Sequence, residues 1–202
     1  MEIKRSALIL LGGMATRAGN RPKYLFEYNG ETFLSRQIQV LRQVTDEIIL
    51  SCRDIEQTQD LLDYPAHKIV TDVRRAAGPS EGIRTGALAA QGEHIFIVAC
   101  DMPLISPGVI EFLFASMGSA EVIIPGWEDG YLEPLHAVYR REALLRYFTE
   151  STSLKLRSIT ESLDTIIIPV QNIRSFDQAL LSFTNINDLE TLTKLKEIKK
   201  LN

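Results

Sequence analysis

The chain has 202 residues, of which 45% are hydrophobic and 24% are charged, and its formal net charge at pH 7 is −4. This is the composition of an ordinary globular protein with its own core, and the net negative charge gives no general attraction for nucleic acid or for an anionic membrane. No apolar run approaches the ~20 residues that span a bilayer, so we expect a cytoplasmic protein that binds neither nucleic acid nor membrane.

Short apolar runs rich in Ile and Val recur along the chain. Several are continuously apolar rather than alternating, which is typical of strands that are covered on both faces. We predict strands at 7–11, 47–52, 67–70, 94–100, 120–125 and 165–170.

Helical patterns lie between these strands. In the first of them, Leu34, Ile38 and Leu41 recur at spacings of four and three and form one apolar stripe. We predict helices at 31–44, 54–63, 81–91, 106–117, 141–148, 153–163 and 187–201, and a hairpin or an extended excursion at 126–139. The alternation predicts a single α/β domain over 1–202, with a mostly parallel (mixed) twisted sheet and helices on both faces, a Rossmann-like arrangement.

The loop after the first strand reads "LGGMATRAGNRPK" and carries three glycines and three cations. It belongs at the carboxyl edge of the sheet, where such folds bind ligands. Glycines let backbone N–H groups approach phosphate oxygens, and Arg17 and Lys23 are placed to neutralise them. A solvated surface turn is the alternative. The loop matches neither a Walker A motif nor a dinucleotide fingerprint, because it lacks Gly-Lys-Ser/Thr and does not open directly into a helix.

Two carboxylates follow later strands. Asp101 comes directly after "HIFIVAC", and Asp72 comes directly after "HKIVT". A carboxylate at the tip of a central strand suits Mg²⁺, which usually takes one or two carboxylates together with substrate phosphates. The alternative for Asp101 is a turn residue before Pro103, and Asp72 taken alone is better explained as a turn residue.

The motifs together resemble a known family. "LLGGMATRAGNRPK" is similar to the LAGGxSxRMGxxK signature of nucleotidyltransferases, and "DVRRAAGPSEGI", "VACDMPLI", "EPLHAVY" and "FTNINDLETL" follow in that order. The set resembles the molybdenum cofactor guanylyltransferase (MobA-like) family over about residues 5–195, which implies the Rossmann-like nucleotidyltransferase fold. The first motif alone marks a broad superfamily, and the combination is more specific.

The resemblance implies transfer of GMP from GTP to molybdenum-loaded molybdopterin, with Mg²⁺ as cofactor and pyrophosphate as the second product. It implies that the N-terminal half binds the nucleotide and the C-terminal half the acceptor. Molybdoenzymes or cofactor-biosynthesis proteins are the protein partners that it suggests, and it leaves the oligomeric state open. The positions that it implies are Leu10, Leu11, Gly12 and Gly13 for base and ribose, Arg17 and Lys23 for the triphosphate, Ser51 and Asp72 for the nucleotide, Asp101 for the metal, and Asn187 for the acceptor or metal side.

Several positions depart from the family pattern. Leu11 replaces a small residue before the glycine pair, Ala18 replaces Met, and Arg21 with Pro22 alters the end of the loop. Glu81 stands in "GPSEG" where the family has "GPLAG", near the expected phosphates, where its carboxylate would either repel the triphosphate or assist the metal.

The base and the acceptor depend on fewer residues. Gly13 after Gly12 leaves room for a purine edge and favours GTP over CTP. His136 is a candidate acceptor contact, although its apolar neighbours favour a structural histidine, and Trp127 and Tyr131 either shape the acceptor pocket or cover the sheet edge. The alternatives are a cytidylyltransferase or another nucleotidyltransferase for a related small phosphorylated acceptor, and a non-catalytic nucleotide-binding relative.

Overall fold

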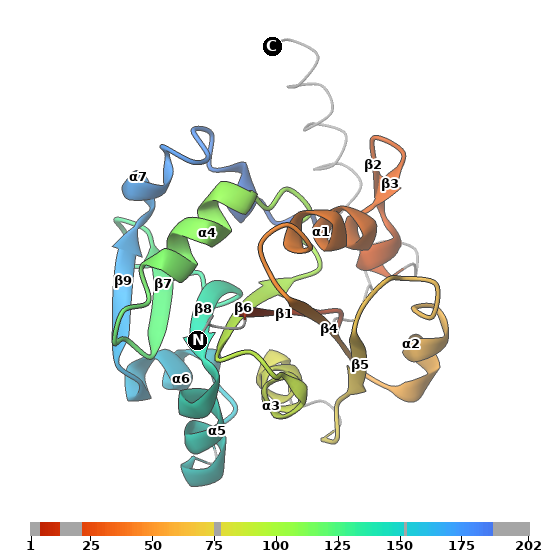
Figure 1. Cartoon of the computed structure of the whole chain (residues 1–202), viewed down its shortest axis with the longest axis horizontal. Helices are drawn as coiled ribbons and strands as arrows, with labels where there is room; N and C mark the ends of the chain where they lie inside the picture. Colours follow the sequence, from red (N-terminus) through yellow and green to blue (C-terminus); the bar gives the residue numbers. More distant parts are fainter. Residues whose placement is uncertain (1–4, 13–21, 75–77, 152, 188–202) are drawn as a thin grey trace.

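The structure is a computed structural model that describes residues 5–12, 22–74, 78–151 and 153–187. A seven-stranded sheet runs through the molecule in the order β5-β4-β1-β6-β8-β7-β9 (Figure 1). Its strands are β1 (Arg5–Leu10), β4 (Glu47–Cys52), β5 (Lys68–Thr71), β6 (His94–Ala99), β7 (Val122–Gly126), β8 (His136–Arg140) and β9 (Thr165–Pro169). β2 (Glu27–Tyr28) and β3 (Glu31–Thr32) form a separate antiparallel hairpin.

The sheet is mostly parallel. β1 pairs in parallel with β4 and β6, and β7 pairs in parallel with β9, whereas β8 runs antiparallel to both β6 and β7. β7 therefore points in the same direction as β1 and β6. The carboxyl ends of β1, β4, β5, β6 and β7 all lie at one edge of the sheet, which is where ligands bind in open α/β folds.

Helices cover both faces of the sheet (Figure 1). α1 and α4 lie on one face, and α3, α5 and α6 lie on the other. The helices are α1 (Phe33–Leu41), α2 (Ile55–Gln59), α3 (Pro79–Ala89), α4 (Pro107–Ala115), α5 (Arg141–Glu150), α6 (Leu156–Ser162) and α7 (Val170–Ile173), with short 3₁₀ turns η1 (Lys23–Leu25) and η2 (Leu181–Phe183).

Two cores form because successive residues of a strand point to opposite faces. In β1, Ala7 and Ile9 pack with α1 and α4, whereas Leu8 and Leu10 pack with α3. This explains why the central strands have continuously apolar sequences, since both of their faces are buried.

α3 lies unusually close to β1 because it carries Gly86. A Cβ atom at this position would come 2.4 Å from Cδ2 of Leu8. The glycine lowers intrinsic helix stability, but it lets the helix approach the middle of β1. Nearer the beginning of α3, a Cβ atom on Gly82 would come 2.8 Å from Ser51 Oγ and 3.0 Å from Leu10 Cδ2, at the carboxyl ends of β4 and β1.

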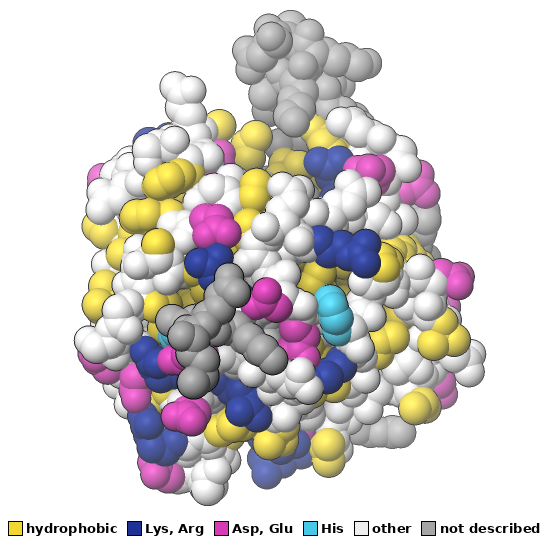
Figure 2. Space-filling model, in the orientation of Figure 1, with side chains coloured by type: hydrophobic (Ala, Val, Ile, Leu, Met, Phe, Trp, Pro, Cys, Tyr) yellow, Lys and Arg dark blue, Asp and Glu magenta, His cyan; other side chains and the backbone are white. Residues whose placement is uncertain are grey.

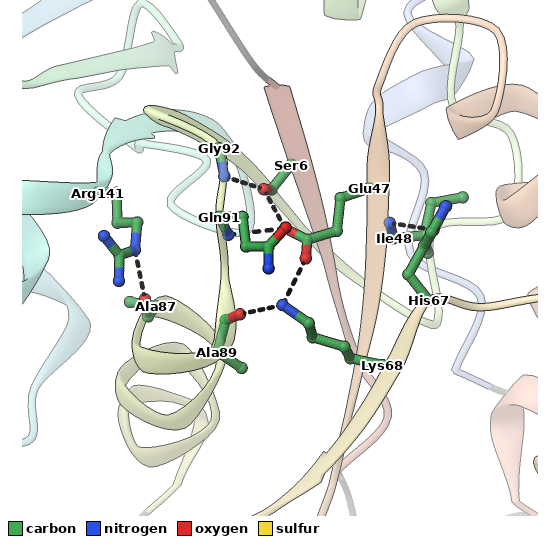
Figure 3. Close-up of polar contacts among 10 residues, drawn as sticks. All are labelled: Ser6, Glu47, Ile48, His67, Lys68, Ala87, Ala89, Gln91, Gly92 and Arg141. Atoms are coloured by element: carbon green, nitrogen blue, oxygen red, sulfur yellow. Dashed lines mark hydrogen bonds and ion pairs between the residues drawn. The ribbon is translucent and has the colours of Figure 1, made fainter.

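A buried polar network ties the sheet together on the side opposite to the carboxyl ends (Figure 3). Glu47 accepts hydrogen bonds from Ser6 Oγ at 2.7 Å and from the Gln91 backbone N–H at 2.8 Å, and it pairs with Lys68 at 2.8 Å. Burial alone would raise the pKa of Glu47, but these contacts hold it below its usual value.

The surface shown in Figure 2 interleaves acidic and basic side chains, and hydrophobic side chains are scattered over it, including the side on which β9 lies. On this strand Ile166 and Ile167 are exposed. Within the described ranges, no helix has the length and hydrophobicity needed to cross a membrane.

The predicted strands are present. Most of their ends differ from the predicted bounds by one or two residues. The helix predicted at 54–63 is shorter, as α2 ends at Gln59, and the segment predicted at 153–163 begins its helix at Leu156. The excursion predicted at 126–139 ends in β8, a full strand inserted between β6 and β7. The helix predicted at 187–201 lies outside the described residues, apart from Asn187.

Candidate active site

A cleft of about 750 Å³ opens at the carboxyl edge of the sheet. The ends of β1, β4, β5 and β6 form its floor, the beginning of α3 lies on one side, and the connection between β7 and β8 lies on the other. Of the residues predicted from sequence to bind nucleotide, metal or triphosphate, those that line the cleft are Leu10, Leu11, Gly12, Lys23, Ser51, Asp72 and Asp101.

The first loop enters the cleft directly from β1. The Leu11 backbone N–H donates to the Ser51 carbonyl oxygen at 2.9 Å, and Gln57 Nε2 donates to the Leu11 carbonyl oxygen at 3.1 Å. These bonds extend the β1–β4 pairing by one residue and fix the backbone that leads to Gly12. Gly13 and Arg17, which the sequence also predicts here, lie outside the described residues.

Lys23 and Asp101 line the cleft and meet Asn187, an exposed residue, at one point. Lys23 Nζ lies 3.0 Å from Asp101 Oδ2 and 2.5 Å from Asn187 Oδ1. The Ile186 backbone N–H donates to the Asp101 carbonyl oxygen at 2.8 Å, which holds the strand tip and the C-terminal segment together. Three residues predicted from motifs far apart in the sequence therefore form one charged cluster.

Gln37 of α1 supports this cluster from below. Its Nε2 atom donates to the carbonyl oxygens of Ala99 at 2.8 Å and Met102 at 2.9 Å, the residues on either side of Cys100 and Asp101. Gln37 is fully buried. Its role was not predicted from the sequence, although a glutamine beside the apolar stripe of a helix is a signal of a buried polar group that needs partners.

Asp101 has the properties of a metal ligand. Its Oδ1 atom is buried and has no hydrogen-bond partner among the described residues, while its Oδ2 atom contacts Lys23. In the described part of the chain, no group of three or more His, Cys, Asp and Glu side chains gathers to hold a metal ion. One carboxylate with substrate phosphates is a common Mg²⁺ arrangement, so the donor set fits this ion better than a cation that needs an all-protein cage.

Ser51, Asp72 and Gly82 form the far side of the cleft, around the ends of β4 and β5. A Cβ atom on Gly82 would lie 2.8 Å from Ser51 Oγ, so the glycine makes room for the hydroxyl. Asp72 Oδ1 is buried without a partner among the described residues. Burial, together with the charge of Glu81, raises the pKa of Asp72 to about 6, and Arg84 opposes this shift.

Glu81 does not reach the cleft. Its side chain is completely buried, and its two oxygens accept bonds of 2.6 and 2.9 Å from Arg84. It also accepts from the Arg74 backbone N–H at 3.2 Å. The Arg84 bonds hold the pKa of Glu81 below its usual value despite burial. Arg84 therefore neutralises the charge of Glu81, the residue by which "GPSEG" departs from the family pattern. The ion pair joins two residues of α3.

His136 lies away from the cleft. It is completely buried in β8, with ring centroids 5.1 Å from Phe96 and 4.8 Å from Phe183. Burial lowers the pKa of His136 to about 3. The position agrees with the structural alternative for this histidine, whereas Asn187, the other candidate acceptor residue, does reach the cluster.

Glu133 is a cleft residue that was not predicted from the sequence. It stands in the motif "EPLHAVY", three residues before His136. It lines the cleft from the connection between β7 and β8 and is only 5% exposed. The signal was available, since a carboxylate before a proline within an otherwise apolar segment is unusual.

Comparisons with known proteins identify the family of the chain. The family model of the MobA-like NTP transferase domain matches residues 7–166. A protein of Methanosarcina acetivorans, described as a probable molybdenum cofactor guanylyltransferase, is 38% identical over 95% of this chain and 89% of its own length. The molybdenum cofactor guanylyltransferase of Desulfosudis oleivorans is 29% identical over 94% of this chain and 93% of its own length.

Solved structures lead to the same group. The crystal structure of molybdopterin-guanine dinucleotide biosynthesis protein A from Archaeoglobus fulgidus superposes with a TM-score of 0.80, at 27% identity, over 98% of this chain and 100% of that one. With its mixed sheet, its cleft at the carboxyl edge and these relatives, the chain belongs to the MobA-like nucleotidyltransferases, in the family of the molybdenum cofactor guanylyltransferases.

Proposed function

We propose that this protein transfers GMP from GTP to the terminal phosphate of molybdenum-loaded molybdopterin and releases pyrophosphate. The observation that carries the proposal is the cluster in which Lys23 and Asp101, both lining the cleft, meet Asn187. An ammonium group beside a carboxylate with one unpartnered oxygen suits a polyphosphate that arrives with a divalent cation.

The nucleotide takes the side of the cleft formed by β1, β4 and β5. The backbone of Leu10 to Gly13 faces base and ribose, Ser51 and Asp72 contact the nucleoside, and Arg17 and Lys23 hold the triphosphate. Support comes from the placement of Leu10, Leu11 and Gly12 beside Ser51 and Asp72 in one cleft. Arg17 and Gly13 enter this proposal from the sequence motif alone.

The acceptor takes the opposite side, between the cluster and the connection from β7 to β8. A phosphate monoester is already anionic at neutral pH, so its oxygen can attack the α-phosphorus of GTP without a general base. The barrier is then charge repulsion and misalignment, which positioned cations reduce. Lys23 neutralises charge on the pyrophosphate leaving group, and Asn187 orients Lys23.

Asp101 would hold Mg²⁺, which when bound supplies a Lewis acid that polarises phosphate oxygens. Lys23 contacts the same carboxylate in the described state. The Oδ1 atom of Asp101 has no partner among the described residues, so Asp101 would offer this oxygen to the ion while Lys23 stays close enough to reach phosphate oxygens. The cytoplasmic location, the single-domain division and the partner proteins that the sequence suggests stay predictions.

An incorporation assay tests the proposal. Labelled GTP, Mg²⁺ and molybdenum-loaded molybdopterin should give a labelled dinucleotide and pyrophosphate, and CTP should substitute poorly. Faster turnover with CTP would identify a cytidylyltransferase. Nucleotide binding without pyrophosphate release for any acceptor would identify a non-catalytic relative and refute the proposal.

A further inference from the structure

Glu133 occupies the part of the cleft that the nucleotide leaves free. β7 runs parallel to β6, so the connection that follows Gly126 rises at the same edge as Asp101. β8 and β7 lie on one side of β6, and β1, β4 and β5 lie on the other. Glu133 and the Ser51–Asp72 pair therefore line opposite sides of the Lys23–Asp101 cluster.

The Glu133 side chain is held in place by its neighbours. Its Oε1 atom accepts a 2.8 Å hydrogen bond from Trp127 Nε1, and its backbone N–H donates to the Pro125 carbonyl oxygen at 3.0 Å. The Trp127 ring packs edge-on against Phe183, with centroids 5.9 Å apart. Both rotamer and backbone are thus fixed before any ligand binds, which lowers the entropic cost of recognition.

The same carboxylate keeps one oxygen without a protein partner among the described residues. It is 5% exposed, and the described residues offer no donor to Oε2. Burial raises the pKa of Glu133 despite the bond from Trp127. A buried carboxylate that lines a cleft with one free oxygen gains free energy when a ligand donates N–H groups to it.

We propose that Glu133 recognises the acceptor by accepting hydrogen bonds from the 2-amino group and the adjacent ring N–H of its pterin. This inference rests on the proposed function, because that function supplies a 2-amino-4-oxopyrimidine edge with two neighbouring donors. A carboxylate has two oxygens with two lone pairs each, so Oε1 can keep Trp127 while both oxygens accept from the ring. Pro134 and Leu135, which also line the cleft, give the flat ring apolar neighbours.

Guanine carries the same pair of donors, so Glu133 could in principle bind the base of GTP instead of the pterin of the acceptor. The affinity for GTP distinguishes the two. The Ser51–Asp72 side already provides a site for the nucleoside. We therefore expect Glu133→Gln to leave the dissociation constant of GTP within about threefold. A variant that weakens GTP binding more strongly than acceptor binding would assign Glu133 to the base and overturn the proposal.

The direct test compares two small ligands. Pterin and lumazine share the bicyclic ring, but lumazine has an oxygen where pterin has its 2-amino group. Trp127 is the single tryptophan of the chain and contacts Glu133, so its fluorescence reports binding at this site. The wild-type protein should bind pterin on the order of tenfold or more tightly than lumazine, as expected for hydrogen bonds to a charged group.

Glu133→Gln keeps the shape and an oxygen for Trp127, but replaces one acceptor by a donor. It should abolish the preference for pterin and raise the KM of the full acceptor about tenfold or more, with little change in kcat. Glu128→Gln, an exposed carboxylate of the same connection, should behave as wild type. Equal binding of the two ligands by the wild type, or an unchanged preference in Glu133→Gln, overturns the inference.

This outcome is separable from failure of the proposed function. If wild-type protein transfers GMP while Glu133→Gln keeps the wild-type KM, only the role of Glu133 fails. If wild-type protein transfers no nucleotide to any acceptor, the function fails, and the ligand comparison still tests whether the cleft binds a pterin.

Discussion

The Lys23 ammonium group lies 3.0 Å from the Asp101 carboxylate, across 78 residues of sequence. Both side chains are partly buried, and Asn187 contacts the same ammonium group. The pair joins the end of the glycine loop to the tip of β6. In the proposed mechanism Lys23 serves the phosphates and Asp101 serves the metal, so the two residues should make different contributions to turnover.

Lys23→Ala should lower kcat/KM by about 30- to 1,000-fold, corresponding to about 2–4 kcal/mol of transition-state stabilisation from a positioned electrostatic donor. Steady-state kinetics with GTP as the varied substrate measures this loss. Arg157→Ala is a suitable control, since the Arg157 side chain is 86% exposed and lies outside the cleft.

Asp101→Asn should abolish detectable turnover while the protein stays folded. It should also remove binding of a paramagnetic Mn²⁺ probe, measured by water-proton relaxation with GTP present, because the amide is a poor ligand for a hard cation. Retained Mn²⁺ binding together with normal turnover would contradict the metal assignment.

Glu81→Ala tests whether the departure "GPSEG" serves structure or chemistry. Removing the carboxylate leaves Arg84, 20% exposed, without its partner, and we expect a loss of about 2 kcal/mol or more in the free energy of unfolding. Urea unfolding measures the loss. The dissociation constant of GTP, measured on the folded fraction, should stay within about threefold, and a strong gain or loss in GTP affinity would show that Glu81 does act on the phosphates.

The sequence predicted the strand and helix alternation because the central strands carry an unambiguous signal. Ile48 and Ile49 are buried on opposite faces, so β4 reads as continuously apolar. The same reasoning could not place β8. "HAVYR" pairs with β6 and β7 and thereby separates strands that a simple alternation would make neighbours. Such a choice depends on long-range pairing, which local periodicity does not encode.

The site divides in the same way. Lys23 and Asp101 were predictable because parallel strands end at a common edge, and the structure brings them within hydrogen-bond distance. The burial of Glu81 was not predictable, since it depends on Arg84 one helical turn later taking both carboxylate oxygens. For Glu133 the motif "EPLHAVY" gave a signal of a special carboxylate, but its hydrogen bond from Trp127 could not be predicted, because that contact depends on the fold of the connection.

Asp72→Asn should stabilise the protein and weaken nucleotide binding. Burial raises the pKa of Asp72 from 3.8 to about 6, so the folded state keeps a proton that the unfolded state releases. The resulting destabilisation is absent below about pH 4, grows between pH 4 and 6, and is complete above pH 6. The melting temperature of Asp72→Asn should therefore exceed that of wild type at pH 8, by about 2–4 °C for each kcal/mol, and the gain should vanish near pH 4. A pH-independent difference would contradict this origin.

His136→Leu tests the buried histidine through its acid dependence. Burial holds the pKa of His136 near 3 in the folded protein, whereas an exposed histidine has a pKa of about 6.5. Between these values the unfolded state binds a proton that the folded state does not, so stability falls as the pH drops below about 6.5. His94, whose pKa is also lowered by burial, contributes with the same sign.

The variant removes the His136 part of this dependence. Urea unfolding at pH 7 and pH 5 should show that the stability lost on acidification is smaller in His136→Leu by about 1–2 kcal/mol. The KM of the acceptor should stay near the wild-type value, because His136 is completely buried between Phe96 and Phe183. A large rise in that KM, with an unchanged loss of unfolding free energy between pH 7 and pH 5, would instead indicate that His136 contributes to acceptor binding.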